Sequence, residues 1–175
     1  MKIILIRHFK VNYKWKLFYN SLGYEKACEG YDKAHVLNAG LSLKINYEIF
    51  ASTMIRAIET TRLIFNKDPD FTEQSLCEVP MKPFMVASIR LPKFVWDIMG
   101  RVQWRLGNKR QPESYVQSKL RVNSFAHWCI SQNKSCIVVC HGWIIKLMIK
   151  ELKRIGFSGT QPIFIKTGMP YEYSI

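Results

Sequence analysis

Two histidines and two arginines of this chain stand at the ends of apolar segments of strand length, or one helical turn beyond. They are Arg7, His8, Arg56 and His141. Ligands of open α/β sheets bind outside the carboxyl ends of the strands, so these four side chains are expected to converge there. Like charges repel one another in an empty site, and such a cluster is favourable mainly around a multiply charged anion. Phosphate is the obvious candidate.

The elements that would position these residues follow from the hydrophobic pattern. Continuous apolar runs, typical of strands covered on both faces, occupy Lys2 to Ile6 and Cys136 to Cys140, and Tyr47 to Ser52 is a third strand. The third strand leads into an amphipathic helix over Met54 to Phe65, which carries Arg56. The pattern therefore predicts strands that feed helices, with the polar residues at the junctions.

Three more helices are expected further along the chain. Their ranges are Phe94 to Leu106, Glu113 to Ile130 and Trp143 to Ile155, with Pro112 as a start signal and Gly156 as a glycine cap. No repeat, low-complexity tract or linker divides the sequence. We expect one α/β domain over residues 1–175, with three layers, α/β/α, around a mostly parallel central sheet.

The composition indicates a folded, basic protein without a membrane span. Among 175 residues, 26 Lys and Arg stand against 13 Asp and Glu, which leaves a formal charge of +13, and 48% of the residues are hydrophobic. This hydrophobic content excludes a disordered basic tail, and the charge favours anionic partners. The apolar runs are too short to cross a bilayer, and no signal peptide is evident. Five cysteines without a C-x-x-C pair indicate reduced thiols in a cytoplasmic protein.

The segments around these residues resemble the histidine phosphatase superfamily, the phosphoglycerate-mutase-like proteins. The motifs that carry the resemblance are Leu5-Ile6-Arg7-His8, Ser52-Thr53-Met54-Ile55-Arg56-Ala57 with Glu59-Thr60, and Val138-Val139-Cys140-His141-Gly142. Leu76-Cys77-Glu78 and Glu113-Ser114 are weaker matches, and all occur in family order. The resemblance implies a phosphoglycerate-mutase-like fold and phosphoryl transfer through a phosphohistidine, with no metal ion and no other cofactor.

The resemblance also implies a role for each residue of the cluster. His8 is the expected nucleophile, and positive charge on Arg7 and Arg56 would lower its pKa and keep the imidazole neutral. Arg7, Arg56 and His141 would hold the phosphoryl oxygens, with His141 also part of the catalytic set. Lys10, two residues beyond His8, adds another charge that attracts phosphate.

Glu78 is the expected general acid and base. It would protonate the leaving oxygen and then activate the water that cleaves the phosphohistidine. The family usually has a glycine and aromatic pattern after this acid, whereas Val79 and Pro80 follow here. Asp32, Glu73 and Asp97 are therefore kept as substitutes.

Phe9 departs from the family pattern, because members normally carry glycine directly after the nucleophilic histidine. A side chain at this position either narrows the phosphate pocket or points away into the core. The first alternative would impair activity, and the second would leave the pocket open.

The segment from Val11 to Val36 is rich in aromatic residues interleaved with lysines, directly beyond the expected nucleophile. It is either a lid on which an aromatic or nucleotide-like ester stacks, or a satellite core whose lysines face water. His35 and His127 lie outside the motifs and are not assigned to catalysis.

These observations together favour a metal-independent phosphomonoesterase that acts on a phosphorylated small molecule through His8. A phosphomutase of the same family is the nearest alternative, because both activities use the same core residues. A catalytically inactive member that binds an anion or nucleic acid is a third, less favoured one, supported by the charge of +13. The sequence does not indicate the physiological substrate or the oligomeric state.

Overall fold

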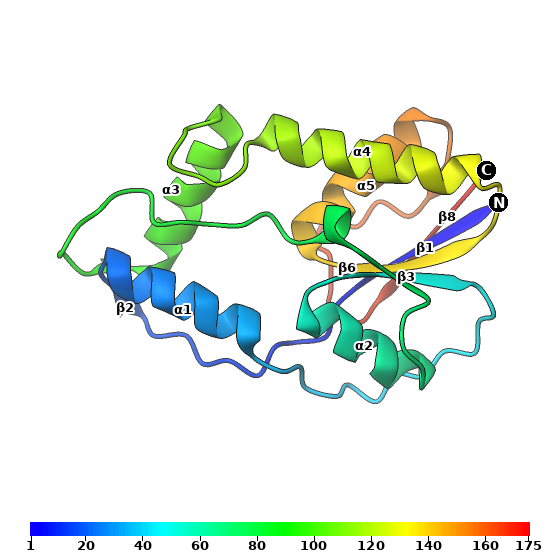
Figure 1. Ribbon diagram of the computed structural model, residues 1–175, viewed down its shortest axis with the longest axis horizontal. Helices are drawn as coiled ribbons and strands as arrows, with labels where there is room; N and C mark the ends of the chain where they lie inside the picture. Colours follow the sequence, from blue (N-terminus) through cyan, green and yellow to red (C-terminus); the bar gives the residue numbers. More distant parts are fainter.

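The computed structural model describes residues 1–175, which fold around a six-stranded central sheet (Figure 1). Its strands are β1 (Lys2–Arg7), β3 (Glu48–Ser52), β4 (Phe71–Glu73), β6 (Cys136–Cys140), β7 (Ser158–Gly159) and β8 (Pro170–Ser174). They lie in the order β4-β3-β6-β1-β8-β7. The first four in this order are parallel, whereas β8 runs antiparallel to β1 and β7 antiparallel to β8. The mostly parallel sheet predicted from the apolar runs is confirmed.

Helices cover both faces of this sheet and complete three layers (Figure 1). They are α2 (Ile55–Phe65) on one face, and α4 (Tyr115–Ser131) with α5 (Gly142–Arg154) on the other. Ser114 begins α4 with a capping box, in which its side chain accepts from the backbone of Gln117 and the Gln117 side chain accepts from the Ser114 backbone. None of the helices combines the length and hydropathy needed to cross a membrane.

A smaller unit, which we call the cap, lies beyond the carboxyl ends of the parallel strands (Figure 1). It consists of α1 (Ser21–Lys33), α3 (Lys93–Leu106) and a two-stranded ribbon of β2 (Phe18–Tyr19) and β5 (Leu91–Pro92). A 3-10 turn, η1 (Gln74–Leu76), leads from β4 toward it. Helix α3 was expected, whereas α1 and the ribbon were not.

The aromatic residues between Val11 and Val36 mostly build the core of the cap. Tyr24 of α1 stacks on the fully buried Trp96 of α3, with 5.6 Å between ring centroids. Tyr19 packs into the same cluster, with Tyr13 and Trp15 at its edge. The satellite-core interpretation therefore describes the packing of these residues, although Trp15, Tyr24 and Tyr31 also line the cavity described below.

Phe9 points into the core and not into the expected phosphate pocket. Its side chain is 1% exposed and packs with Ile4, Ile6 and the residues under α2. Gly168, at φ +72°, faces the Phe9 ring so closely that a Cβ there would lie 2.6 Å from a ring carbon. Only glycine suits both the contact and the backbone conformation. Of the two alternatives for Phe9, the core position is the observed one.

Glu151 ties α5 to α4 and provides a test of stability. Its buried carboxylate accepts from His127 Nε2 at 2.8 Å and from Arg154 Nη2 at 2.6 Å. These hydrogen bonds, that from Arg154 first, lower the pKa of Glu151 to about 2. The carboxylate therefore contributes stability above its ordinary pKa of 4.5, and this is lost as pH falls toward about 2.

The variant Glu151→Gln is expected to lower the free energy of unfolding at neutral pH by about 1–3 kcal/mol, because it weakens charged hydrogen bonds in a buried setting. Its difference from the wild type should shrink at about pH 3, where the wild-type carboxylate loses part of its advantage. Urea titrations at the two pH values measure both effects. Glu48→Gln is a control, since Glu48 lies 3.7 Å from Lys134 in an exposed pair. An equal difference at both pH values would contradict the assignment.

Candidate active site

The predicted residues meet at the carboxyl edge of the sheet because their strands are neighbours in parallel register. Arg7 of β1 is paired with Cys140 of β6, so His8 and His141 follow at the same level. The imidazole centroids of these two histidines are 5.0 Å apart. A cavity of about 1740 Å³ opens between this edge and the cap, and Arg7, His8 and Arg56 line it.

His8 is held as a neutral imidazole with one ring nitrogen free. Its Nδ1 lies 2.6 Å from the carbonyl oxygen of Phe9, which can only accept, so Nδ1 carries the proton and Nε2 carries the lone pair. Burial, the Arg56 guanidinium and, to a smaller extent, Arg7 lower the pKa of His8 to about 3, against the opposing effect of the Phe9 carbonyl. An unprotonated nitrogen is what nucleophilic attack requires.

His141 is fully buried behind His8, and both of its ring nitrogens are hydrogen bonded. Its Nδ1 accepts from Arg56 Nε at 3.2 Å, so Nε2 carries the proton and donates to Ser52 Oγ at 2.9 Å. Burial first, then the electrostatic effects of the neighbouring His8 and Arg56 side chains, hold the pKa of His141 well below its ordinary value. His141 does not line the cavity. Through its hydrogen bond to Arg56 Nε, it orients the Arg56 side chain in this structure. Its direct contact with phosphate stays a prediction.

The two arginines approach the cavity from different elements. Arg56, in the first turn of α2, is 2% exposed and donates from Nη1 to Asp32 Oδ1 at 2.8 Å. Arg7 donates from Nη1 to the carbonyl oxygen of Ile165 at 2.7 Å, but its Nε is buried without a partner. A buried guanidinium N–H without an acceptor is costly. Because Arg7 lines the cavity, its orphaned Nε indicates a place for a ligand oxygen.

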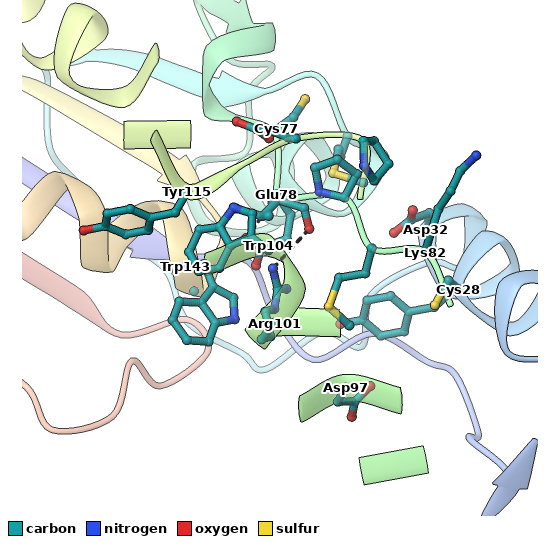
Figure 2. Close-up of a pocket in the computed structure, with 18 of the residues that line it drawn as sticks. Cys28, Asp32, Cys77, Glu78, Lys82, Asp97, Arg101, Trp104, Tyr115 and Trp143 are labelled. Atoms are coloured by element: carbon teal, nitrogen blue, oxygen red, sulfur yellow. Dashed lines mark hydrogen bonds between the residues drawn. The ribbon is translucent and has the colours of Figure 1, made fainter. Parts of the chain in front are cut away.

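Glu78 lies where the chain leaves η1 and lines the same cavity. Its Oε1 accepts from the backbone nitrogen of Val79 at 3.0 Å. Figure 2 shows its side chain beside Trp104 and Arg101, with Asp32 on the other side of the cavity. A carboxyl group in this position can reach a leaving group that extends from the strand edge toward the cap.

The other carboxylates considered as acids are less suitable. Asp32 is ion paired with Arg56 at 2.8 Å, and Asp97 with Lys93 at 2.5 Å. Glu73 does not line the cavity. Of these four carboxylates, Glu78 is the one that faces the cavity without an ion-pair partner.

Lys10 is not part of the site, contrary to the expectation that it adds a phosphate-seeking charge. Its side chain is exposed and does not line the cavity, while its carbonyl oxygen accepts from Leu37 at 2.8 Å. His35 pairs with Glu59 away from the cavity. Strand β1 ends at Arg7, so the regular geometry of the strand does not carry Lys10 to the edge where His8 lies, and proximity to His8 in sequence misled.

Two contacts of the site were not expected from the sequence. Asp32 pairs with Arg56, and the Tyr31 ring lies 5.2 Å from the Arg56 guanidinium carbon. Both residues come from α1, whose position against α2 is set by tertiary packing. The structure contains no group of three or more His, Cys, Asp or Glu side chains that could hold a metal ion.

The fold and the site together define a three-layer α/β protein with paired histidines and arginines at the carboxyl edge of a mostly parallel sheet. The sequence profile of the histidine phosphatase superfamily (branch 1) matches residues 3–169, and the chain belongs to this family. The resemblance seen in the motifs is thereby confirmed. Comparison with curated proteins gives no match.

Solved structures with the same fold include both mutases and phosphatases by name. A phosphoglycerate mutase from Bacillus anthracis str. Sterne is 16% identical, with a TM-score of 0.61 over 99% of this chain and 90% of that one. A putative alpha-ribazole-5'-P phosphatase from Escherichia coli str. K-12 is 18% identical, with a TM-score of 0.53 over 87% and 79%. A phosphoserine phosphatase from Entamoeba histolytica is 18% identical, with a TM-score of 0.54 over 87% and 80%. At these identities the similarity concerns the fold.

Proposed function

We propose that this protein is a metal-independent phosphomonoesterase that hydrolyses a phosphorylated small molecule through a phosphohistidine on His8. The observation that carries the proposal is the presence of two side chains in one cavity: a neutral His8, whose Nε2 is free, and Arg7, whose buried Nε lacks a partner. The first offers a nucleophile and the second an anion site, and both line one cavity.

The reaction proceeds in two displacements at phosphorus. His8 Nε2 attacks the phosphoryl group, so that an N–P bond forms while the P–O bond to the leaving alcohol breaks. Glu78 donates a proton to the leaving oxygen and is left as a carboxylate. That carboxylate then takes a proton from water, which attacks the phosphohistidine, breaks the N–P bond and releases inorganic phosphate. His8 and Glu78 return to their starting states.

Arg7 and Arg56 supply the positive charge that many phosphoryl-transfer enzymes obtain from magnesium. Guanidinium groups bind phosphoryl oxygens with charge-assisted hydrogen bonds, and they need no metal to neutralise the charge on the transferring group. Arg56 is held against His141 and is almost fully buried, which fixes its position. Preorganised donors of this kind stabilise the transition state without rearrangement during the reaction.

The size and lining of the cavity favour an ester with a substantial leaving group. Its volume of about 1740 Å³ exceeds the roughly 300–1,000 Å³ of ordinary ligand pockets. On the wall formed by α3, α4 and α5, Arg105 lies 3.8 Å from the Tyr115 ring centroid, and Arg101 and Lys146 lie 5.1 and 4.7 Å from that of Trp143. A buried site for one phosphate suits a small molecule better than nucleic acid.

The five free cysteines support a cytoplasmic location.

Hydrolysis of p-nitrophenyl phosphate in the presence of EDTA tests the proposal. We expect turnover that EDTA does not reduce, and a phosphorylated protein whose label is lost in acid and survives in alkali, as a phosphohistidine requires. Activity that disappears with EDTA and returns with a divalent metal would contradict the mechanism.

Two other outcomes would redirect the assignment. Transfer of the label to a second phosphate ester in preference to water would identify a mutase. Binding of inorganic phosphate without turnover of p-nitrophenyl phosphate or of a panel of natural esters would identify a non-catalytic anion-binding protein.

A further inference from the structure

The Asp32 carboxylate is hydrogen bonded to the Arg56 guanidinium, the group that the proposed reaction requires for binding phosphate. Asp32 Oδ1 accepts from Arg56 Nη1 at 2.8 Å, and both residues line the cavity with Arg7 and His8. The Arg56 side chain is only 2% exposed, whereas the Asp32 side chain is 50% exposed. The ion pair thus joins a fixed, buried cation to an anion that reaches in from the cap.

Arg56 is fixed from the side opposite the cap. Its Nε donates to His141 Nδ1 at 3.2 Å, and His141 is anchored in turn by Ser52. With Nε and Nη1 both engaged, an incoming phosphate finds only the second terminal nitrogen, Nη2, without a protein acceptor. To bind Arg56 through Nη1 as well, phosphate must displace the Asp32 carboxylate.

The position of Asp32 is not explained by the stability of α1. It lies in the last turn of this helix, where the negative end of the helix dipole disfavours a carboxylate. Helix α1 is instead held to α3, within the cap, by Tyr24, which stacks on Trp96. Tyr31, the neighbour of Asp32, lies 5.2 Å from the Arg56 guanidinium carbon. The end of α1 is therefore anchored over Arg56, and the half-exposed Asp32 side chain can turn toward solvent.

We propose that Asp32 occupies the phosphate position on Arg56 in the free protein and thereby sets the affinity of the site for phosphate. The inference rests on the proposed function, because it takes Arg56 as a phosphate ligand. A carboxylate and a phosphate dianion repel each other at one guanidinium, so substrate binding includes displacement of Asp32. The same carboxylate favours release of the product, inorganic phosphate. Asp32 is accordingly a residue that sets the affinity for phosphate and is not the proton donor.

Titration calorimetry with inorganic phosphate at fixed ionic strength tests this inference without any need for turnover. Asp32→Asn keeps the shape of the side chain and removes the competing charge. We expect it to bind phosphate about tenfold tighter than the wild type, the ratio that corresponds to one modest ionic interaction. Glu29→Gln is the matched control, since Glu29 lies on the same helix and lines the same cavity. It removes the same charge and is expected to change the affinity by less than about twofold.

A double-mutant cycle shows whether the effect passes through Arg56. In an Arg56→Gln background, Asp32→Asn is expected to produce no gain in phosphate affinity, because the competing pair is already absent. In steady-state assays, Asp32→Asn should lower the KM for p-nitrophenyl phosphate and the inhibition constant for phosphate together, by about tenfold. Asp32→Ala serves as a second variant and should act in the same direction.

Unchanged or weaker phosphate binding in Asp32→Asn would overturn the inference. So would a fall in kcat of about 100-fold or more at constant KM, because that result would make Asp32 a proton donor. Tighter phosphate binding in Asp32→Asn, together with no hydrolysis by the wild type, would support the role of Asp32 and reject the phosphatase assignment. The two proposals are therefore separated by the same set of proteins.

Discussion

Replacement of His8 by alanine is expected to reduce the turnover of phosphate monoesters by at least about 10⁴-fold, the scale on which loss of a catalytic nucleophile usually acts. The reason is that His8 Nε2, the proposed nucleophile, is free, while both ring nitrogens of His141 are engaged. Phosphate binding should persist, because Arg7 and Arg56 are unchanged. Steady-state assays with p-nitrophenyl phosphate and titration calorimetry with phosphate measure the two properties separately.

His35→Ala is the control for this experiment, since His35 is exposed and lies outside the cavity. It is expected to retain wild-type activity. A His8→Ala protein with more than about a tenth of wild-type kcat would reject the phosphohistidine route. Loss of both turnover and phosphate binding, with an unchanged melting temperature, would indicate that His8 binds the anion and does not attack it.

The pH dependence provides a second test of His8. Burial and the Arg56 charge lower its pKa to about 3, so the imidazole is neutral at every pH above that value. No loss of kcat/KM is therefore expected from protonation of His8 between about pH 5 and 8. The same shift makes the stability of the folded protein depend on pH, in the direction opposite to that of a histidine with a carboxylate partner. Below the ordinary histidine pKa of 6.5, His8 binds a proton in the unfolded chain but not in the folded protein, so stability falls as the pH drops from 6.5 toward 3.

The central sheet and its covering helices could be predicted because their apolar patterns are strong. Strand β6, Cys136–Cys140, is buried at every position and has the bounds expected from its apolar run. Helix α1 was missed because only Tyr24 and Ala27 of its thirteen residues are buried, which leaves too small an apolar face to detect. The feature of the sequence that could have indicated this helix is Asn20, whose side chain caps the helix by accepting a hydrogen bond from the backbone nitrogen of Gly23.

The candidate site divides in the same way. Arg7, His8 and His141 could be placed because parallel strands in register bring their ends to one edge. The contact of Asp32 with Arg56 could not be predicted, since it joins residues 24 positions apart and Asp32 lies on α1, a helix without a clear hydrophobic pattern. The direction of Phe9 also depended on a distant residue, Gly168, which makes room for its ring. Local patterns specify elements, whereas pairs across a cavity depend on how those elements pack.

Substitution of Glu78 by glutamine is expected to lower kcat for alkyl phosphates by about 10²–10³-fold, the usual contribution of a general acid. An alkoxide is a poor leaving group and needs the proton that Glu78 donates in the proposed mechanism. p-Nitrophenolate leaves readily without protonation, so the first displacement should proceed at close to the wild-type rate with p-nitrophenyl phosphate. The second displacement still requires a base to activate water, and the phosphohistidine should then accumulate.

Rapid-quench measurements distinguish these steps. Glu78→Gln is expected to release a burst of p-nitrophenol close to one equivalent, followed by slow turnover, with glycerol phosphate hydrolysed poorly throughout. Glu25→Gln is the control, because Glu25 lines the cavity on the cap side and has no part in the proposed chemistry. Equal losses on both substrates without a burst would remove Glu78 from proton transfer. Asp32 would still be a poor replacement, since its carboxylate is bound to Arg56 and would have to leave that guanidinium before it could serve a leaving group.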